Sequence, residues 1–242
     1  MKAELFLVPG VIGEERLSNK TLVLIDVLRA STTICRSLDS GARAVIPVES
    51  SGEAVEMRTK IGSEDAILAG ERKGIKIENF DLGNSPHEYT AERVSGKIII
   101  LTTSNGTRSY ARASLSSLIL TGSLVNISRV TTRVARADRD LVIQCAGDDG
   151  DFSIEDTLCG GMLLHKLIAE EKVDLKLNDA ASLALLLYRT NRRSLRQVIA
   201  QGEHGRYLAE LGFASDVDLA ASPDTIPVLP VLKDRRIVLD EE

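Results

Sequence analysis

The chain has 242 residues, of which 43% are hydrophobic and 27% charged, and its formal net charge at pH 7 is −5. A chain of this size buries a core large enough to fold without a disulfide or a structural metal, and its composition argues against a disordered protein. The negative charge and the 3% aromatic content argue against a nucleic-acid-binding protein, because such proteins need a basic face and rings that stack on bases.

The chain begins with a short apolar run at residues 5–8, which a Pro-Gly pair ends. This run is too short for a signal peptide and is interpreted as a first strand. The longer apolar runs, such as residues 180–188, are too short to cross a bilayer. The three cysteines lack C-x-x-C spacing and fit buried thiols in a reducing compartment. We therefore expect a cytoplasmic protein with no membrane partner.

Apolar runs alternate with helical stretches along the first two thirds of the chain. The runs are hydrophobic throughout rather than alternating, a pattern typical of strands that are covered on both faces. We predict strands over residues 22–27, 44–48, 66–69, 98–101, 117–121 and 141–145. We predict helices over residues 30–40, 51–60, 104–113, 124–137 and 155–171. This order predicts a three-layer α/β/α fold with a largely parallel or mixed central sheet.

The last third of the chain has a different character. Residues 178–190 and 194–212 are helical in pattern, and Gly212 is placed to end the second helix. An extended tail with several prolines follows, and it ends in a strand-like run at residues 236–239. No glycine- or serine-rich linker divides the chain, so we predict one domain over residues 1–242 with a helical C-terminal portion. A two-lobed arrangement, divided near residues 145–160 with a cleft between the lobes, stays open.

A first group of functional candidates follows the predicted strand at residues 22–27. Asp26 stands at its end, and Arg29, Ser31 and Thr32 open the next helix. Ligands of open α/β sheets bind beyond the carboxyl ends of the strands, and a helix N-terminus with hydroxyl groups suits an anion. The alternative is structural: Ser31 or Thr32 caps the helix, and Arg29 pairs with a surface acid.

A second group follows the strand at residues 66–69. Arg72 offers a planar fork for phosphate or carboxylate, whereas Lys73 offers a point charge and is the less certain cation of the two. Further along, Asn84 and Ser85 present an amide and a hydroxyl group in a turn. The alternative is a solvated loop.

A third group follows the strand at residues 98–101. Asn105, Gly106 and Arg108 lie in the sequence TTSNGTR, whose composition is that of an anion-binding nest at the start of a helix. The chain has neither a P-loop nor a dinucleotide-binding glycine motif. This lack weighs against a nucleotide-using enzyme.

A fourth group is acidic and follows the strand at residues 141–145. Glu155 and Asp156 are candidate ligands for Mg²⁺, which takes a few carboxylates together with water and substrate phosphate. The alternative is that they stabilise the start of a helix through its dipole. The acids at positions 148, 149 and 151 are interpreted as solvated turn residues. His204, further on, is a candidate for substrate contact, against the alternative of a surface or core histidine.

With these segments the chain resembles the 2-phosphosulfolactate phosphatase family over nearly its full length. The matching stretches are DVLRASTTI (26–34), GERKGIKIENFDLGNSP (70–86), TTSNGTR (102–108), CAGDDGDFSIED (145–156), the weaker HGRYL…LG (204–212) and the VPVL tail. Together and in this order they are far more specific than any one alone. Ser104 stands where the family is expected to have threonine, and the hydroxyl group is kept.

The resemblance implies an α/β/α phosphatase that depends on Mg²⁺ and hydrolyses the phosphate ester of a small 2-hydroxy acid. The reaction named for the family converts 2-phospho-3-sulfolactate and water to 3-sulfolactate and phosphate, a step toward coenzyme M in methanogens. We expect Mg²⁺ to be held by Asp26 with Glu155 or Asp156. The nucleophile is either a metal-bound water, which we prefer, or Asp26 itself.

Residues and resemblance together give one set of expected roles. The residues expected to act in catalysis are Asp26, Arg29, Arg72 and Glu155. The residues expected to bind substrate are Ser31, Thr32, Asn84, Ser85, Asn105, Gly106, Arg108 and His204. The alternative function is a non-catalytic protein that binds a small phosphorylated or sulfonated acid, which would need the cations but not the carboxylates. A homodimer stays open.

Overall fold

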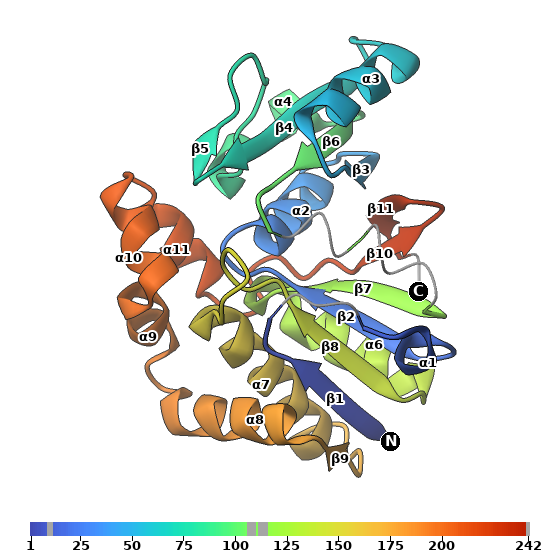
Figure 1. Cartoon of the computed structure of the whole chain (residues 1–242), viewed down its shortest axis with the longest axis vertical. Coiled ribbons are helices and arrows are strands. Elements are labelled where there is room, and N and C mark those ends of the chain that lie inside the picture. The colour runs from blue at the N-terminus through green and yellow to red at the C-terminus, as the bar shows by residue number, and fades with distance from the viewer. Residues whose placement is uncertain (9–11, 106–109, 111–115, 241–242) are drawn as a thin grey trace.

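A computed structural model describes residues 1–8, 12–105, 110 and 116–240 of the chain (Figure 1). The strands among these residues are β1 (Lys2–Phe6), β2 (Thr21–Ile25), β3 (Ala44–Pro47), β4 (Ala66–Arg72), β5 (Ile75–Lys76), β6 (Ile98–Thr102), β7 (Leu118–Gly122), β8 (Leu141–Cys145), β9 (Lys176–Leu177), β10 (Pro230–Lys233) and β11 (Arg236–Leu239). The α-helices are α1 (Glu14–Leu17), α2 (Ala30–Asp39), α3 (Ser51–Ile61), α4 (Ala91–Val94), α6 (Ile127–Ala137), α7 (Ile154–Ala169), α8 (Asp179–Asn191), α9 (Leu195–Gln201), α10 (Glu203–Glu210) and α11 (Ala214–Ala220). Short 3-10 helices span Pro86–Glu88 (η1) and Leu124–Asn126 (η2).

The described strands form one mixed sheet in the order β5-β4-β6-β3-β11-β10-β7-β2-β8-β1-β9. Strands β4, β6 and β3 pair in parallel and form the upper block, named from its place in Figure 1. Strands β7, β2, β8, β1 and β9 also pair in parallel and form the lower block. The antiparallel hairpin β10–β11 joins the two blocks, because Val231 pairs with Leu120 and Ile237 pairs with Val45.

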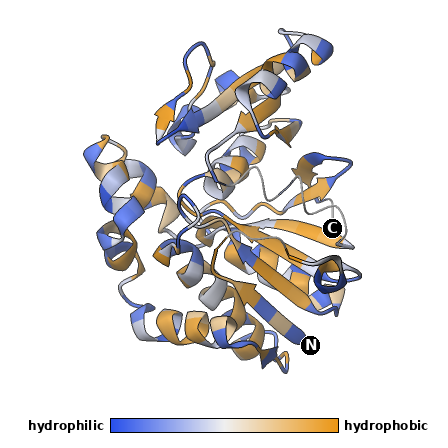
Figure 2. Ribbon diagram, viewed as in Figure 1, coloured by the Kyte–Doolittle hydropathy of each residue, from blue (hydrophilic) through white to orange (hydrophobic). Residues whose placement is uncertain are grey.

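Strand β2 illustrates why the sheet is covered on both faces. Its side chains are all buried, and successive residues point to opposite faces. Leu22 and Leu24 pack in the core that contains α1 and α2, whereas Val23 and Ile25 pack in the core of α6, α7 and α8. Figure 2 shows the apolar strands between helices whose outer faces are more polar. The predicted α/β fold with helices on both sides of a mixed sheet is therefore confirmed.

The predicted elements agree with the observed ones to within a few residues, with one correction in the helical C-terminal portion. The single helix predicted over residues 194–212 is two helices, α9 and α10, because Gly202 between them is extended. A Cβ atom at Gly205 would lie 2.1 Å from the carbonyl oxygen of Ile199, so only glycine allows the two helices to approach so closely. Gly212 follows α10 with φ of +90°, as expected for a residue that ends a helix.

Three further sequence expectations concern particular segments. The helix predicted over residues 104–113 lies for the most part outside the described residues. Residues 145–160 lie within the lower block, where they lead from the end of β8 into α7. Across the described ranges, every helix is too short or too polar to span a bilayer.

Helices α7 and α8 approach most closely at Gly161, where a Cβ atom would lie 2.0 Å from the carbonyl oxygen of Ala184. We expect Gly161→Ala to lower the free energy of unfolding by about 1–3 kcal/mol, the usual cost of overpacking a core. Gly52→Ala in the first turn of α3 is the matched control, because its new methyl group meets only Ser50 Oγ at 3.9 Å. Urea unfolding followed by circular dichroism measures both, and equal midpoints for Gly161→Ala and the wild type would contradict the close approach.

Candidate functional site

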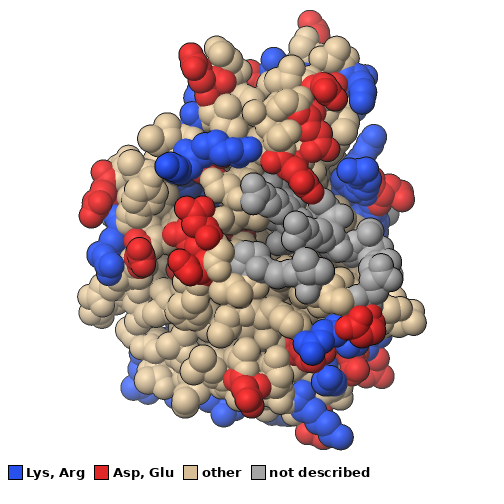
Figure 3. All heavy atoms as spheres, in the orientation of Figure 1, with Lys and Arg blue, Asp and Glu red and all other residues tan. Residues whose placement is uncertain are grey.

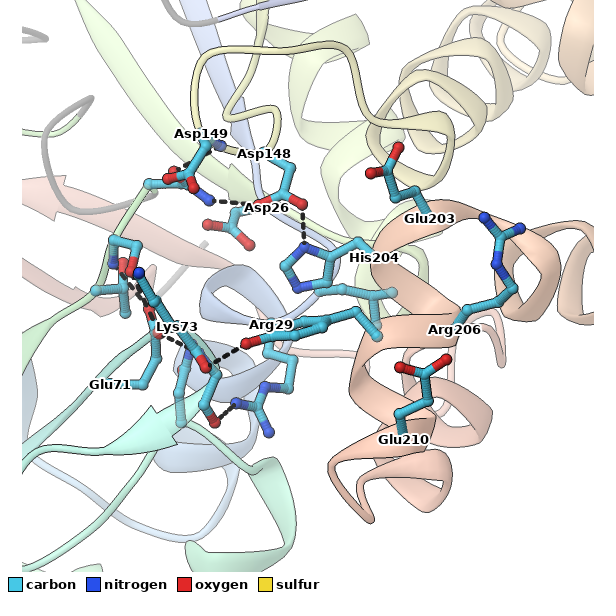
Figure 4. A pocket seen from close by; sticks show the side chains of 17 residues that line it. Asp26, Arg29, Glu71, Lys73, Asp148, Asp149, Glu203, His204, Arg206 and Glu210 are labelled. Carbon is cyan, nitrogen blue, oxygen red and sulfur yellow. Dashed lines mark hydrogen bonds and ion pairs between the residues drawn. The ribbon is translucent and has the colours of Figure 1, made fainter.

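A cavity of about 530 Å³ opens where the carboxyl ends of β2, β4, β6 and β8 meet helix α10 (Figure 4). The residue after β2 contributes Asp26, and β4 contributes Glu71. The loops after β6 and β8 contribute Asn105 and Asp148, and α10 contributes His204. This is the edge of an α/β sheet at which ligands bind. The sequence predicts a site at this edge of the sheet, and a cavity opens there.

A buried ion pair between Arg29 and Asp216 holds three parts of this site together. The Nη1 atom of Arg29 donates to Asp216 Oδ2 at 2.7 Å, and Nη2 donates to the carbonyl oxygen of Gly74 at 2.7 Å. The guanidinium carbon lies 4.4 Å from the ring centre of Phe213. Ser85 Oγ donates to the other oxygen of Asp216 at 2.7 Å. Arg29 thus lines the cavity while its charge is paired, and Ser85 acts on Asp216 and does not line the cavity.

The hydroxyl groups of Ser31 and Thr32 form local hydrogen bonds instead of facing the cavity. The backbone N–H of Asp26 donates to Ser31 Oγ at 3.0 Å. Thr32 Oγ1 donates to the carbonyl oxygen of Val27 at 2.8 Å and lies 2.8 Å from Ser123 Oγ. Both side chains are buried and neither lines the cavity, so their expected contact with substrate is corrected to a structural role. They fix the turn that presents Asp26.

The end of β4 supplies a different cation from the one that we expected. Arg72 is exposed and lies outside the cavity lining, where it donates to the carbonyl oxygen of Glu71 at 2.7 Å and to Thr102 Oγ1 at 3.0 Å. Lys73 lines the cavity, and its ammonium group has no partner among the described residues. The carboxylate of Glu71 accepts from the backbone N–H groups of Gly74 at 2.8 Å and Ser104 at 2.7 Å. Glu71, which the sequence reasoning did not single out, therefore joins the loops after β4 and β6.

Two asparagines lie at the cavity as predicted. Asn84 is buried, and its Oδ1 atom has no hydrogen-bond partner among the described residues. Asn105 joins two loops, because its Nδ2 donates to Asp148 Oδ1 and its Oδ1 accepts from the backbone N–H of Asp149, both at 3.3 Å. Gly106 and Arg108 lie outside the described residues.

His204 and Asp148 form an ion pair at the rim of the cavity. His204 Nδ1 lies 2.9 Å from Asp148 Oδ2. Asp148, interpreted as a solvated turn acid, keeps 38% of its side chain exposed but also contacts His204. The hydrogen bond from His204 lowers the pKa of Asp148. Burial alone would lower the pKa of His204, but the hydrogen bond to Asp148 and the nearby charges of Asp148, Glu155 and Asp26 outweigh it, so the pKa of His204 is raised.

Three buried carboxyl groups lie next to the site. Burial raises the pKa of Asp26, Glu155 and Asp156 to about 7 each, and their mutual repulsion adds to the shift. Asp156 accepts from the backbone N–H groups of Val27 at 2.8 Å and Gly147 at 3.1 Å. No other residue in the described part of the chain donates a hydrogen bond to the carboxylate of Glu155, whose own backbone N–H lowers its pKa. In that same part, no group of three His, Cys, Asp or Glu side chains is arranged to hold a metal ion on its own.

Both signs of charge meet on this face of the molecule. Figure 3 shows basic side chains directly above a group of acidic ones, between the upper block and the C-terminal helices. The cavity lining also holds both signs of charge, with Lys73 and Arg206 as well as Asp26 and Asp148. An anionic ligand that also carries or recruits a cation is the kind of ligand that such a lining accommodates.

Comparison with known proteins assigns the chain to a family. The model of the 2-phosphosulpholactate phosphatase family matches residues 6–235. A relative from Caldanaerobacter subterraneus subsp. tengcongensis is 38% identical over 222 residues, which cover 92% of this chain and 91% of the relative. A relative from Clostridium acetobutylicum is 39% identical over 230 residues, which cover 95% of this chain and 97% of the relative. Both are named "Probable 2-phosphosulfolactate phosphatase".

These matches define the chain as an enzyme of the phosphatase class, which acts on phosphate monoesters. It belongs to the 2-phosphosulfolactate phosphatase family, as the resemblance of its motifs indicated.

The burial of Glu155, to which the charges of nearby acids add, makes a prediction for Glu155→Gln. The folded chain keeps a proton on Glu155 up to about pH 7, whereas the unfolded chain releases it near pH 4.5. The free energy of unfolding of the wild type should therefore fall as the pH rises from about 4.5 to about 7. The free energy of unfolding of Glu155→Gln should fall less over the same range. In thermal unfolding with EDTA, the variant should melt higher than the wild type at pH 8 and nearly equal to it at pH 5. Each kcal/mol gained should raise the melting temperature by about 2–4 °C.

The control for this prediction is Glu56→Gln, because Glu56 is exposed on α3. It should change the melting temperature little at either pH. An equal gain at pH 5 and pH 8 for Glu155→Gln, or no gain at pH 8, would contradict the raised pKa of Glu155.

The two neighbouring cations of β4 make a second prediction. Lys73→Ala should lower kcat/KM for phosphate release by about 10- to 100-fold, since a hydrogen bond to a charged group contributes about 1.5–3 kcal/mol. Arg72→Ala should lower it less, because Arg72 lies outside the cavity. Steady-state kinetics of the two variants measure the difference. A larger loss in Arg72→Ala would restore the original assignment of Arg72.

Proposed function

We propose that the protein hydrolyses the phosphate ester of a small 2-hydroxy acid, namely 2-phospho-3-sulfolactate, to give 3-sulfolactate and phosphate. The observation that carries this proposal is the cavity in which Lys73, His204 and Asp26 face a common space at the carboxyl ends of the strands. Membership of the family and the names of its relatives support the choice of ester.

The charges of this ester suit the lining of the cavity. The phosphoryl, carboxylate and sulfonate groups of 2-phospho-3-sulfolactate are all anionic, so binding needs several positive or hydrogen-bonding groups in one place. Lys73, Arg206 and His204 provide positive charge, and Asn84 provides an amide group. Phosphoryl transfer needs mainly positioning and the stabilisation of charge, and side chains fixed around a closed space supply both.

We extend the proposal to Mg²⁺, held by Asp26 and Glu155. The Oδ1 atom of Asp26 accepts a hydrogen bond from the backbone N–H of Ala30 at 3.1 Å. Among the described residues, the Oδ2 atom has no hydrogen-bond donor, so it can bind a cation. No other described residue donates a hydrogen bond to the carboxylate of Glu155, which hydrogen-bonds only to its own backbone N–H. One or two carboxylates are enough for Mg²⁺ in proteins, because water and substrate phosphate complete its shell. When bound, the ion would neutralise charge on the phosphoryl oxygens.

Asp156 is assigned a different task in this arrangement. Both of its oxygens accept backbone N–H groups, so it ties the turn after β2 to the loop after β8. That tie fixes the distance between the segments that carry Asp26 and Glu155. Of the two partners considered for Asp26, the hydrogen bonding favours Glu155.

Phosphate release from 2-phospho-3-sulfolactate and from 2-phospholactate tests the proposal. Release should occur in the presence of Mg²⁺, stop with EDTA and resume when Mg²⁺ is added back. Tight binding of both esters without release would support the non-catalytic binding protein. Full activity in EDTA would refute the metal part alone.

A matched pair of variants accompanies this experiment. Asp26→Asn should lose most of the activity and need more Mg²⁺, because an amide oxygen replaces a charged ligand poorly. Asp39→Asn at the exposed end of α2 should keep the wild-type rate. Normal, EDTA-insensitive activity in Asp26→Asn would show that Asp26 serves the turn after β2 only.

A further inference from the structure

His204 is held in one orientation by side chains from two loops. Its Nδ1 atom lies 2.9 Å from Asp148 Oδ2, and Asn105 Nδ2 donates to the other oxygen of Asp148 at 3.3 Å. The backbone N–H of Asp148 donates to the carbonyl oxygen of Asp151 at 3.0 Å, and the return bond is 2.8 Å. The loop after β8 therefore presents a fixed carboxylate to the ring.

The second ring nitrogen of His204 faces the cavity. Figure 4 shows the ring below Asp148, with Nε2 turned toward the space between Asp26, Lys73 and Arg29. Within the described part of the chain, Nε2 has no hydrogen-bond partner. The ring also lies edge-on to Tyr207, with 6.3 Å between the ring centres, and Tyr207 donates its hydroxyl to the carbonyl oxygen of Lys73 at 2.9 Å. The imidazole thus has one nitrogen bound to a carboxylate and the other open to a ligand.

The charges around the ring favour its protonated form. Asp148, Asp26 and Glu155 act on it from the loop after β8, the turn after β2 and helix α7. Lys73, Arg29 and Arg206 also line the cavity and oppose a positive charge. The sum keeps the pKa of His204 above its ordinary value, despite burial. A ring in this state has a proton on Nε2 to donate.

The proposed reaction needs such a proton. Hydrolysis breaks the bond between phosphorus and the ester oxygen, and the electron pair stays on that oxygen. The leaving group of a 2-hydroxy acid ester is an alkoxide, which is a poor leaving group until it is protonated. The oxygen of the attacking water forms the new bond to phosphorus, and the proton that this water loses passes to solvent. The imidazole regains its own proton from solvent, so the reaction leaves it unchanged.

We infer that His204 is the general acid that protonates the ester oxygen as it leaves, and that Asp148 is its positioning residue. This inference rests on the proposed function and goes beyond substrate binding, the role that the sequence assigned to His204.

The test compares His204→Gln, Asp148→Asn and His165→Gln with the wild type, using 2-phospho-3-sulfolactate and an analogue with sulfur in place of the ester oxygen. A thiolate leaves without a proton, so only the oxygen ester needs the acid. His204→Gln should lower kcat on the oxygen ester by about 100- to 10,000-fold, the usual contribution of a general acid, with little change in KM. On the sulfur ester its loss should be no more than a few-fold.

The other two variants, Asp148→Asn and His165→Gln, test the positioning role and the specificity of the effect. Asp148→Asn should lower kcat on the oxygen ester by less, and its activity should fall at a lower pH than that of the wild type, because the imidazolium loses its carboxylate. His165→Gln, on α7 next to Tyr188, is the matched histidine control and should keep the wild-type kcat. Circular dichroism checks that each variant is folded.

Different outcomes overturn different parts of the argument. Equal losses on both esters, or a raised KM with normal kcat, would make His204 a binding residue and overturn the inference. An Asp148→Asn variant with wild-type kinetics, or a His204→Gln variant with wild-type kcat, would do the same. No phosphate release from either ester by the wild type would overturn the proposed function, and the inference with it.

Discussion

The site depends on the buried ion pair between Arg29 and Asp216. Arg29 follows the lower-block strand β2. Gly74 lies in the turn after β4, Ser85 precedes η1, and Asp216 lies on α11. Removing one partner of a buried pair leaves an uncompensated charge, at a cost of about 3–5 kcal/mol. These contacts therefore join the turn after β2, the segment after β4 and helix α11 around the cavity.

A second constraint is the concentration of carboxyl groups beside that pair. Asp26, Glu155 and Asp156 are buried together, and only His204 among the nearby described cations is positioned to lower the pKa of Asp26. Water cannot screen charges in such a place, so their repulsion has to be offset by protons or by a bound cation. The protein folds around such a group only because other interactions offset the repulsion. The burial of apolar side chains on both faces of β2 provides this favourable free energy.

The sequence predicts the fold well because continuous apolar runs identify buried strands, and residues 22–27 are a clear example. It does not predict that β10–β11 lies between the two blocks, since strand order depends on long-range pairing. Asp26 and Asn105 are found at the cavity as expected, because residues after strand ends share one edge of the sheet. Asn84, in a turn, and His204, on α10, also line the cavity, but their place depends on long-range packing. The sequence cannot show whether Arg72 or Lys73 faces the cavity, because that depends on the backbone of a turn in which Lys73 has a φ of +52°. Asp148 was missed because its partner lies 56 positions away, on α10.

The position of the β10–β11 hairpin has a consequence for synthesis. The hairpin fills the middle of the sheet, yet it follows every other described strand in the chain. Until it leaves the ribosome, β3 and β7 each present a row of unpaired N–H and C=O groups to other molecules. A nascent chain of this protein therefore exposes two unpaired strand edges until residues 230–239 have been made.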